Sequence, residues 1–362
     1  MFLIPSLNLG GAERVTVNLA NQFSKKKYKV YVISLIPNGF YENELINDIN
    51  LICLDIKRAR NSIIPIYKLI KKYKPKYCIS MTREINISCG IIFKIFHLNS
   101  KLIIREASPF YYSTINNKYL LKSVYLKVLK FAYSSATGFI ANSKLTLKTY
   151  LNNNLISKKT EITVIGNPII LNSSSKANKS KNQIKIKNKF SFVSIGRLHK
   201  VKDHKTLIKA FNIFIDKYPN AILRIYGEGP ERENLEKLVR KLNLNNKVFF
   251  MGLVKNPINH LLKSDIFILS SLHEGFGNVL VEAMYSKLKI ICSDSLLNGS
   301  ELVYNRNCFT FFKVGDFIDL SSKMTEVIRN ENKFEESNYI HSLNYKSDII
   351  SKKYDDFLKK NN

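Results

Sequence analysis

Short apolar runs alternate with longer amphipathic segments along this 362-residue chain. The apolar runs have the length of strands, and the segments between them repeat apolar residues at helical spacing. Strands are predicted at residues 2–5, 29–35, 77–81, 101–106, 138–143 and 161–166, and then at 190–196, 222–227, 247–252, 266–271, 289–293 and 309–313. Helices are predicted around residues 11–24, 62–73, 85–97 and 118–134. This alternation predicts parallel sheets with helices on both faces, the doubly wound α/β class.

The pattern is broken once, near the middle of the chain. Residues 172–189 (NSSSKANKSKNQIKIKNK) are polar and rich in lysine, so a linker is predicted over 171–189. The chain is long enough for two cores. We therefore expect two Rossmann-like domains, over 1–170 and 190–335. Ligands of such sheets collect at the carboxyl ends of the strands, so a cleft between the two domains is the expected site.

The net charge of +29 is concentrated in the first half. Residues 1–170 contain 25 Lys and Arg against 8 Asp and Glu, whereas residues 191–362 contain 26 against 20. This distribution predicts an anionic partner. No nucleic-acid recognition motif is evident, so an anionic membrane surface is favoured over nucleic acid. A general Lys/Asn/Ile bias in composition would explain part of the excess.

The sequence favours a protein of the reducing cytoplasm. Five cysteines show no Cys-x-x-Cys pair, and the N-terminus has no signal-peptide pattern. No apolar run reaches the roughly 18 residues of a membrane span. The segment YLLKSVYLKVLKFAY (119–133) is an amphipathic helix that is expected either to lie on a membrane surface or simply to cover the sheet. We therefore expect a cytoplasmic protein, peripheral on the inner face of the cell membrane.

The most informative stretch is HEGFGNVLVEAM (273–284). An apolar strand is followed by a Gly-Phe-Gly turn and a helix that opens near Asn278. Gly275 and Gly277 let a diphosphate approach the backbone at a helix N-terminus. Glu282, one turn into the helix, would accept hydrogen bonds from a ribose, and Glu274 would face the group beyond the phosphates. Two glutamates interacting with a helix dipole on a solvated face are the simpler alternative.

Basic residues follow the first strand of the second half. Gly196 and Arg197 lie at its end, and Lys202 comes five residues later. Arg197 can contact a phosphate with two donors, and Lys202 adds a point charge. Near the N-terminus, Gly10 and Gly11 directly precede a helix, which alone is equally typical of an ordinary turn.

These motifs together resemble the retaining glycosyltransferases of family 4, which have the GT-B fold. The matching segments are SLNLGGAERVTVNLA (6–20), FVSIGRLHKVKDHKTLIKAF (192–211), LRIYGEGPERENLEKL (223–238), VFFMGLV (248–254) and residues 273–284. The resemblance implies that a C-terminal helix over 336–362 packs back on the first domain. It implies donor binding by Gly10, Gly11, Gly196, Arg197, Lys202, Gly227, Glu274, Gly275, Phe276, Gly277, Asn278, Val279 and Glu282. Among these, Glu274, Arg197 and Lys202 would also serve catalysis.

The expected acceptor side departs from the family at one position. Many relatives place a histidine in the segment that follows the strand at 101–106, where this chain has Ala107. This departure puts a histidine-assisted contact to the acceptor in question. Glu106 is the remaining candidate there, either to orient the acceptor hydroxyl as a catalytic residue or to form a structural ion pair.

The resemblance implies a retaining hexosyltransferase. It would move a hexose or N-acetylhexosamine from a UDP-linked donor to a lipid-linked saccharide, in the synthesis of capsule, lipopolysaccharide or a related surface polysaccharide. No Asp-x-Asp motif or ligand cluster suggests a metal, so a metal-independent enzyme without cofactor is expected. A nucleotide-sugar epimerase and a non-catalytic basic protein that binds membranes or polyanions are the alternatives.

Overall fold

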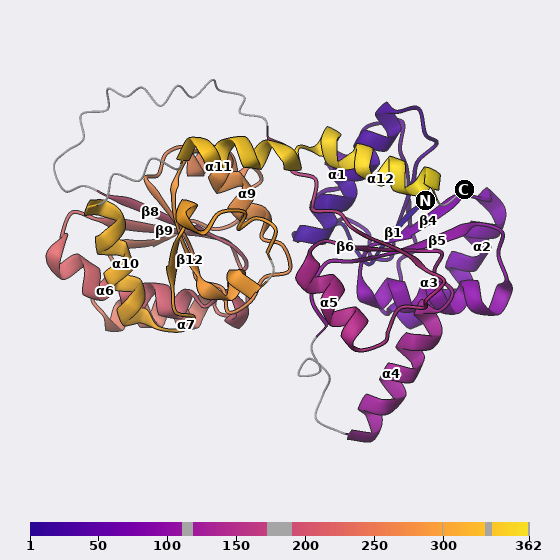
Figure 1. The fold of residues 1–362 in the computed structure, drawn as a ribbon, viewed down its shortest axis with the longest axis horizontal. Coiled ribbons are helices and arrows are strands. Elements are labelled where there is room, and N and C mark those ends of the chain that lie inside the picture. The colour runs from indigo at the N-terminus through magenta and orange to yellow at the C-terminus, as the bar shows by residue number, and fades with distance from the viewer. Residues whose placement is uncertain (111–118, 172–189, 299, 330–334, 361–362) are drawn as a thin grey trace. The chain divides into compact units, whose positions relative to one another are not determined.

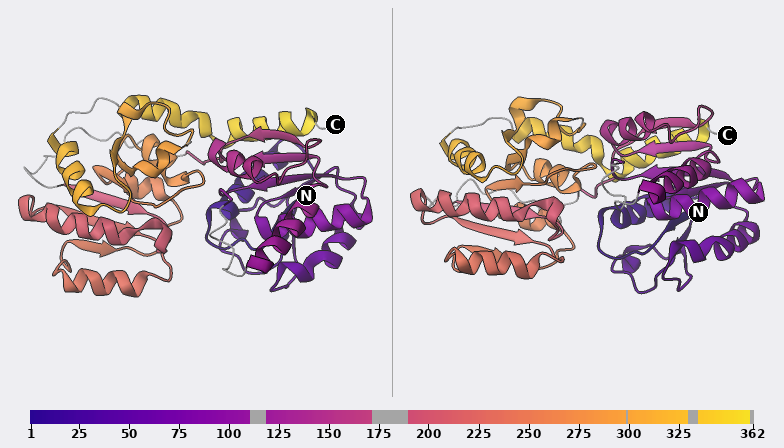
Figure 2. Two further views of the ribbon diagram at one scale, coloured as in Figure 1. Left: turned by 60° about the horizontal axis from the view of Figure 1, so that its bottom comes forward. Right: turned by 90° about the horizontal axis from the view of Figure 1, so that it is seen from below.

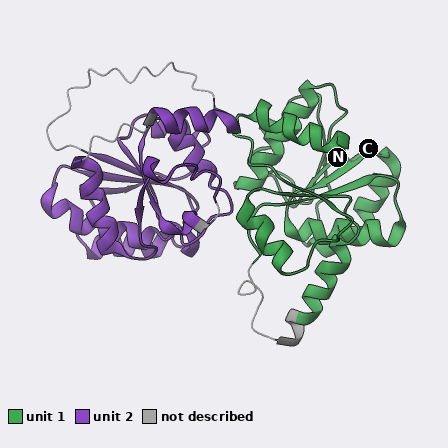
Figure 3. Ribbon diagram, viewed as in Figure 1, with its two compact units in different colours: residues 1–170, 345–362 green, residues 171–344 purple. Residues whose placement is uncertain are grey.

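The computed structural model describes residues 1–110, 119–171, 190–298, 300–329 and 335–360. The chain forms two compact units, which Figure 3 shows in different colours. Unit 1 comprises residues 1–170 and 345–362, and unit 2 comprises residues 171–344. Residues 172–189 of the linker predicted over 171–189 lie outside the described residues.

The sheet of unit 1 is parallel throughout its described strands. Its spatial order is β3-β2-β1-β4-β5-β6-β7. The strands are β1 (Phe2–Ile4), β2 (Tyr31–Ser34), β3 (Asn50–Cys53), β4 (Tyr77–Ser80), β5 (Lys101–Glu106), β6 (Gly138–Ala141) and β7 (Glu161–Val164). The central strands are buried on both faces, which is why they appear in the sequence as continuous apolar runs.

Helices cover both faces of this sheet (Figures 1 and 2). They are α1 (Gly11–Lys25), α2 (Ile63–Tyr73), α3 (Arg83–Phe96), α4 (Tyr119–Tyr133), α5 (Lys144–Asn152) and α12 (Ser347–Lys360). The helices α2 to α5 share one hydrophobic core with the sheet, whereas α1 and α12 pack together on the other face. The final helix is tied to unit 1 by hydrogen bonds from the Tyr28 hydroxyl to Asp355 at 2.6 Å and from the Tyr77 hydroxyl to the Leu358 carbonyl at 2.8 Å.

The sheet of unit 2 is also parallel, in the order β10-β9-β8-β11-β12-β13. Its strands are β8 (Ser191–Ile195), β9 (Ile222–Tyr226), β10 (Val248–Phe250), β11 (Ile266–Leu269), β12 (Lys289–Ser293) and β13 (Thr310–Phe312). Its helices are α6 (His204–Lys217), α7 (Arg232–Lys241), α8 (Pro257–Leu261), α9 (Asn278–Tyr285), α10 (Phe317–Arg329) and α11 (Glu335–Ser342). The helices α6, α7 and α10 form the main core with the sheet, and α8 and α11 pack against α9.

The predicted strands are confirmed, with ends that differ by at most two residues. In the first half of the chain, strand β3 and helix α5 were not predicted. The tail expected as one helix over 336–362 is two helices, α11 and α12, separated by a short 3-10 turn at Leu343–Tyr345. The helix is interrupted because the backbone there pairs with Ile169: the Ile169 amide donates to the Tyr345 carbonyl at 2.9 Å, and the Ser347 amide donates to the Ile169 carbonyl at 3.0 Å.

Candidate active site

Each sheet has a point where its strand order reverses, between β1 and β4 in unit 1 and between β8 and β11 in unit 2. In doubly wound sheets, ligands bind beyond the carboxyl ends of the strands at this point. The loop after β8 carries Gly196, Arg197 and Lys202, and the loop after β11 carries residues 270–277. The predicted donor-binding residues of unit 2 therefore lie mainly at its reversal point.

Backbone and side-chain contacts join these two loops. The Leu272 amide donates to the Val201 carbonyl at 2.8 Å. The Ser270 hydroxyl donates to the Lys202 carbonyl, also at 2.8 Å. As a result the Lys202 ammonium lies 2.5 Å from Oε1 of Glu274, although 72 residues separate them in the sequence. The structure thus brings together two residues that the sequence assigned to different parts of the ligand.

The turn at 275–277 leads into α9 as the sequence predicted. Gly277 has φ of 89°, a left-handed conformation that favours glycine, and α9 begins at Asn278. Phe276 is buried in this turn, and Gly275, Asn278 and Val279 are partly exposed. Glu282 lies within α9 and is only 1% exposed, so a ribose would reach its carboxylate only through a local rearrangement of its neighbours.

Arg197 and Gly227 occupy different environments. Arg197 is exposed, and it forms no ion pair with any residue that the structure describes, so its guanidinium is accessible to an anion. Gly227 has a packing role: a Cβ there would lie 2.0 Å from the Gly196 carbonyl oxygen. The Gly196 amide also donates to the Tyr226 carbonyl at 2.9 Å. The backbones after β8 and β9 therefore meet at the two glycines.

In unit 1, Gly10 and Gly11 lie where expected, at the start of α1 and just after β1. The carboxylate of Glu13 folds back over Gly10, because a Cβ added at Gly10 would lie 2.0 Å from Glu13 Oε2. The Glu13 carboxylate thus lies near the helix N-terminus at which the resemblance implied donor binding. A phosphate at this position would have to displace it.

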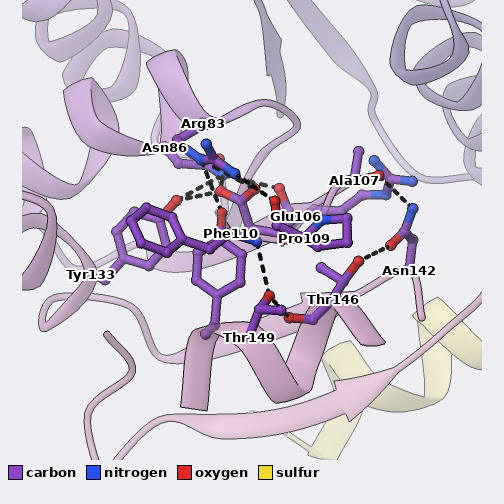
Figure 4. A network of polar contacts seen from close by, with 12 residues as sticks. Arg83, Asn86, Glu106, Ala107, Pro109, Phe110, Tyr133, Asn142, Thr146 and Thr149 are labelled. Atoms are coloured by element: carbon purple, nitrogen blue, oxygen red, sulfur yellow. Dashed lines mark hydrogen bonds and ion pairs between the residues drawn. The ribbon is translucent and has the colours of Figure 1, made fainter. Parts of the chain in front are cut away.

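Glu106 lies in the interior of unit 1, where Arg83, Asn86 and Tyr133 surround it (Figure 4). It is 2% exposed. The Asn86 amide donates to Glu106 Oε1 at 2.7 Å, the Tyr133 hydroxyl donates to the same oxygen, and Arg83 Nε lies 3.9 Å from Oε2. Burial raises the pKa of the Glu106 carboxyl, and the Arg83 charge and the hydrogen bonds oppose this rise. These buried contacts fit the structural ion pair, which was one of the two alternatives given for Glu106.

Ala107 follows this network and is held through its backbone. The Asn142 amide donates to the Ala107 carbonyl at 2.7 Å, as Figure 4 shows. The Phe110 amide then donates to the Thr149 hydroxyl at 2.9 Å. The segment that lacks the expected histidine is therefore fixed by its main chain, with residues of α5 and the preceding loop as partners.

The described residues contain no cluster of three or more His, Cys, Asp or Glu side chains placed to bind a metal ion. Across the described parts of the chain, every helix is too short or too polar to span a bilayer.

Comparison with known proteins gives the family. Residues 9–173 match the family described as Glycosyltransferase Family 4, and residues 175–342 match Glycosyl transferases group 1. The chain is 30% identical, over 83% of its length and 81% of the relative, to the N-acetylgalactosamine-N,N'-diacetylbacillosaminyl-diphospho-undecaprenol 4-alpha-N-acetylgalactosaminyltransferase of Campylobacter jejuni. The chain belongs to glycosyltransferase family 4.

Two further similarities support this assignment of family and fold. A second Campylobacter jejuni enzyme, an alpha-1,4-N-acetyl-D-galactosaminyltransferase whose name gives a diphospho-undecaprenol-linked trisaccharide as acceptor, is 27% identical over 91% of this chain and 89% of its own. The crystal structure of Anabaena HepE in complex with UDP and glucose superposes with a TM-score of 0.79 at 19% identity, covering 99% of this chain and 98% of that one. The fold is GT-B, with two parallel-sheet α/β domains.

Sequence reasoning missed several residues that organise the site. Ser271 donates to Glu274 Oε1 at 2.6 Å, and Arg83, Asn86 and Tyr133 surround Glu106. A signal for Ser271 was available, because it is a polar residue at the carboxyl end of a predicted strand. Asn86 and Tyr133 occupy buried positions of helices, where the sequence gives no indication that they share one partner.

Proposed function

We propose that this glycosyltransferase moves a hexose or N-acetylhexosamine from a UDP-linked donor to a lipid-linked saccharide, with retention of anomeric configuration. The observation that carries the proposal is the Lys202–Glu274 contact at the reversal point of unit 2, next to the turn that opens α9. A cation for phosphate and a carboxylate for sugar hydroxyls are thereby placed side by side. Both Campylobacter relatives are named as alpha-transferases that act on diphospho-undecaprenol-linked sugars.

The proposed roles follow from the charge of each side chain and from its place at the carboxyl ends of the strands. Arg197 and Lys202 neutralise the donor diphosphate, including the charge that grows as the bond from sugar to phosphate breaks. Glu274 binds the hydroxyls of the donor sugar, and Glu282 binds the ribose after a local rearrangement exposes its buried carboxylate. In a front-face reaction the leaving phosphate accepts the proton of the attacking hydroxyl, so no separate protein base is required. Two cationic side chains and a helix terminus supply the positive charge, which supports a reaction without a metal ion.

The proposed contact with an anionic membrane involves the outer face of α4. Val124, Val128 and Phe131 recur at helical spacing and are 56%, 38% and 46% exposed. Lys127 and Lys130, both exposed, flank this apolar stripe, while Leu129 of the same helix is buried in the core. An apolar stripe bordered by lysines suits the interface of a bilayer with anionic headgroups. It would hold the enzyme peripherally at the inner face of the cell membrane.

The donor site is tested by nucleotide-dependent thermal stability. UDP at about 100 times its dissociation constant should stabilise the protein by about 2.7 kcal/mol, whereas GDP and ADP at the same concentration should stabilise it less. The UDP effect should be lost in Glu282→Ala. UDP-sugars are then screened with lipid-linked saccharides, and the anomeric configuration of the product is read by NMR.

Two results would contradict the proposal. A folded wild-type protein that no nucleotide stabilises would lack the donor site. Consumption of a UDP-sugar without any acceptor, giving an epimer, would identify an epimerase instead.

A further inference from the structure

The carboxylate of Glu274 is held unevenly. Its Oε1 accepts two hydrogen bonds, from Lys202 Nζ at 2.5 Å and from the Ser271 hydroxyl at 2.6 Å. Its Oε2 accepts none from any residue that the structure describes, and the side chain is 9% exposed. One oxygen is thus fully occupied, and the other remains available to a ligand.

Ser271 is itself fixed by the neighbouring strand. It is 1% exposed and follows β11, which pairs with β12. Its carbonyl accepts hydrogen bonds from the hydroxyls of Ser293, at 2.6 Å, and Ser295, at 3.1 Å. These two hydroxyls lie 2.7 Å apart. The Ser271 backbone is therefore anchored from β12, and its side chain points at Glu274.

The two donors to Oε1 will respond differently to a diphosphate. Lys202 is a flexible cation with a 24% exposed side chain, and a nearby diphosphate competes for it through charge-assisted hydrogen bonds. Ser271 is neutral and only 1% exposed, so a phosphate competes for its hydroxyl far less than for the Lys202 ammonium. When Lys202 turns to the phosphate, Ser271 is the donor to the Glu274 carboxylate that remains among the residues the structure describes.

We propose that Ser271 is a positioning residue that keeps Glu274 aimed at the donor sugar while Lys202 transfers to the diphosphate. This inference rests on the proposed function, because it assumes a nucleotide-sugar at this site. The Ser271 hydroxyl donates to Oε1 of Glu274, and Oε2 accepts a hydrogen bond from a sugar hydroxyl. The hydroxyls of Ser293 and Ser295 hold the Ser271 backbone in place. Binding of the nucleotide and binding of the sugar are thereby assigned to different side chains.

Loss of the Ser271 hydroxyl should have an effect on ligand binding that differs from the effect of a general loss of structure. Because Ser271 acts through Glu274, its removal should weaken the contact with the sugar and leave the contact with the nucleotide intact. The useful quantity is the ratio of the dissociation constants of UDP-sugar and UDP. A loosened fold would weaken both ligands and leave this ratio near its wild-type value.

The experiment is calorimetric titration of the full chain with UDP, UDP-N-acetylgalactosamine and UDP-glucose. The ratio is taken for whichever sugar nucleotide binds the wild type more tightly. In Ser271→Ala, we expect the UDP dissociation constant to stay within about twofold and the ratio to rise about tenfold, the size of one lost hydrogen bond to a charged group. Ser271→Thr, which keeps the hydroxyl, should restore the wild-type ratio.

A matched control is Ser264→Ala. Ser264 is also buried in unit 2, and its hydroxyl donates to the His260 carbonyl at 3.2 Å. This variant should leave both constants unchanged. Lys202→Met should show the opposite split, with weaker UDP binding and a ratio near the wild-type value.

The outcomes separate the inference from the function on which it rests. If Ser271→Ala binds UDP normally with an unchanged ratio, or weakens UDP and UDP-sugar equally, the positioning role is wrong and the donor site stands. If the folded wild-type protein binds neither UDP nor a UDP-sugar, the proposed function fails and the inference fails with it.

Discussion

His204, the first residue of α6, is a buried histidine two positions after Lys202. Burial, with a smaller contribution from the Lys202 charge, lowers its pKa from 6.5 to about 3. Between these two values the unfolded chain binds a proton that the folded chain does not. The contribution of neutral His204 to the free energy of unfolding is therefore fully present above pH 6.5 and is lost progressively as the pH falls toward 3.

We expect the midpoint of thermal unfolding to fall on acidification, with a contribution from His204 that approaches about 1.4 kcal/mol per pH unit. In His204→Asn this contribution should vanish and the pH dependence should become shallower. Ser264→Ala, a change at a buried residue of unit 2 that has no titratable group, should keep the wild-type slope. Equal slopes for the wild type and His204→Asn would contradict the burial argument, because the comparison uses the slope and not the absolute midpoint.

At the scale of single residues, the sequence predicted the positions of the site better than its contacts. Glu274, Arg197 and Lys202 follow strands, and the carboxyl ends of parallel strands share one edge of a sheet. The pairing of Lys202 with Glu274 could not be predicted, because it depends on which strands are neighbours. The burial of Glu106 and Glu282 was also missed, since a charged residue near a strand end or helix start is usually exposed.

The final helix shows how one element depends on a single buried charge. Arg105, in β5, is fully buried. Its Nε donates to the Tyr354 hydroxyl of α12 at 3.0 Å, and its Nη2 donates to Asn167 Oδ1 at 2.5 Å. The guanidinium thus joins α12 and the segment after β7 to the sheet, both within unit 1. A buried donor that loses its partner costs about 1–3 kcal/mol.

Tyr354→Phe should therefore loosen α12 with little change in side-chain volume. We expect amide hydrogens of residues 347–360 to exchange about tenfold faster or more, since a loss of about 1.4 kcal/mol is a factor of ten. The comparison variant is Tyr77→Phe, which removes the bond from a half-buried hydroxyl to the Leu358 carbonyl. Water can replace that donor, so its effect should be smaller. An equal effect of the two variants would show that Arg105 does not anchor the helix.

At the scale of elements, the unpredicted pieces have specific causes. The β3 residues are half-buried or exposed, so they lack the continuous apolar run of the central strands. The N-cap residue of α5 lies at the end of the strand predicted at 138–143, which is too long by two residues. Ser143 is its N-cap and accepts from the Thr146 amide at 3.1 Å. Serine is a common N-cap residue, so Ser143 could have indicated the start of a helix. The prediction instead counted it as the last residue of the preceding strand.

At the scale of the whole molecule, the two-domain organisation was readable because alternation of strand and helix persists on both sides of the polar segment 172–189. The distribution of charge was equally readable, since residues 1–170 carry most of the basic excess. The exposure of the apolar stripe on α4 could not be predicted, because an amphipathic pattern does not show which face of the helix the rest of the protein covers. Its inner face packs on α3, and Val124, Val128 and Phe131 remain outside.

This combination predicts binding to anionic membranes. The chain should co-sediment with vesicles of phosphatidylglycerol and phosphatidylcholine, and more weakly with phosphatidylcholine alone. High salt should reduce the difference, because it screens the lysine charges. Phe131→Ser should weaken binding about tenfold, since burial of much of an exposed phenylalanine in lipid contributes about 1–2 kcal/mol.

Ile318→Ser is the comparison variant that distinguishes membrane binding through α4 from nonspecific binding through any exposed apolar side chain. Ile318 lies on α10 of unit 2 and is 67% exposed, more than any residue of the α4 stripe. If membrane binding depended on exposed apolar area alone, this variant would weaken it at least as much as Phe131→Ser. Binding through α4 requires that Ile318→Ser behave as the wild type. Equal loss in the two variants, or no preference for anionic vesicles, would remove the membrane from the proposed function and leave the donor site untouched.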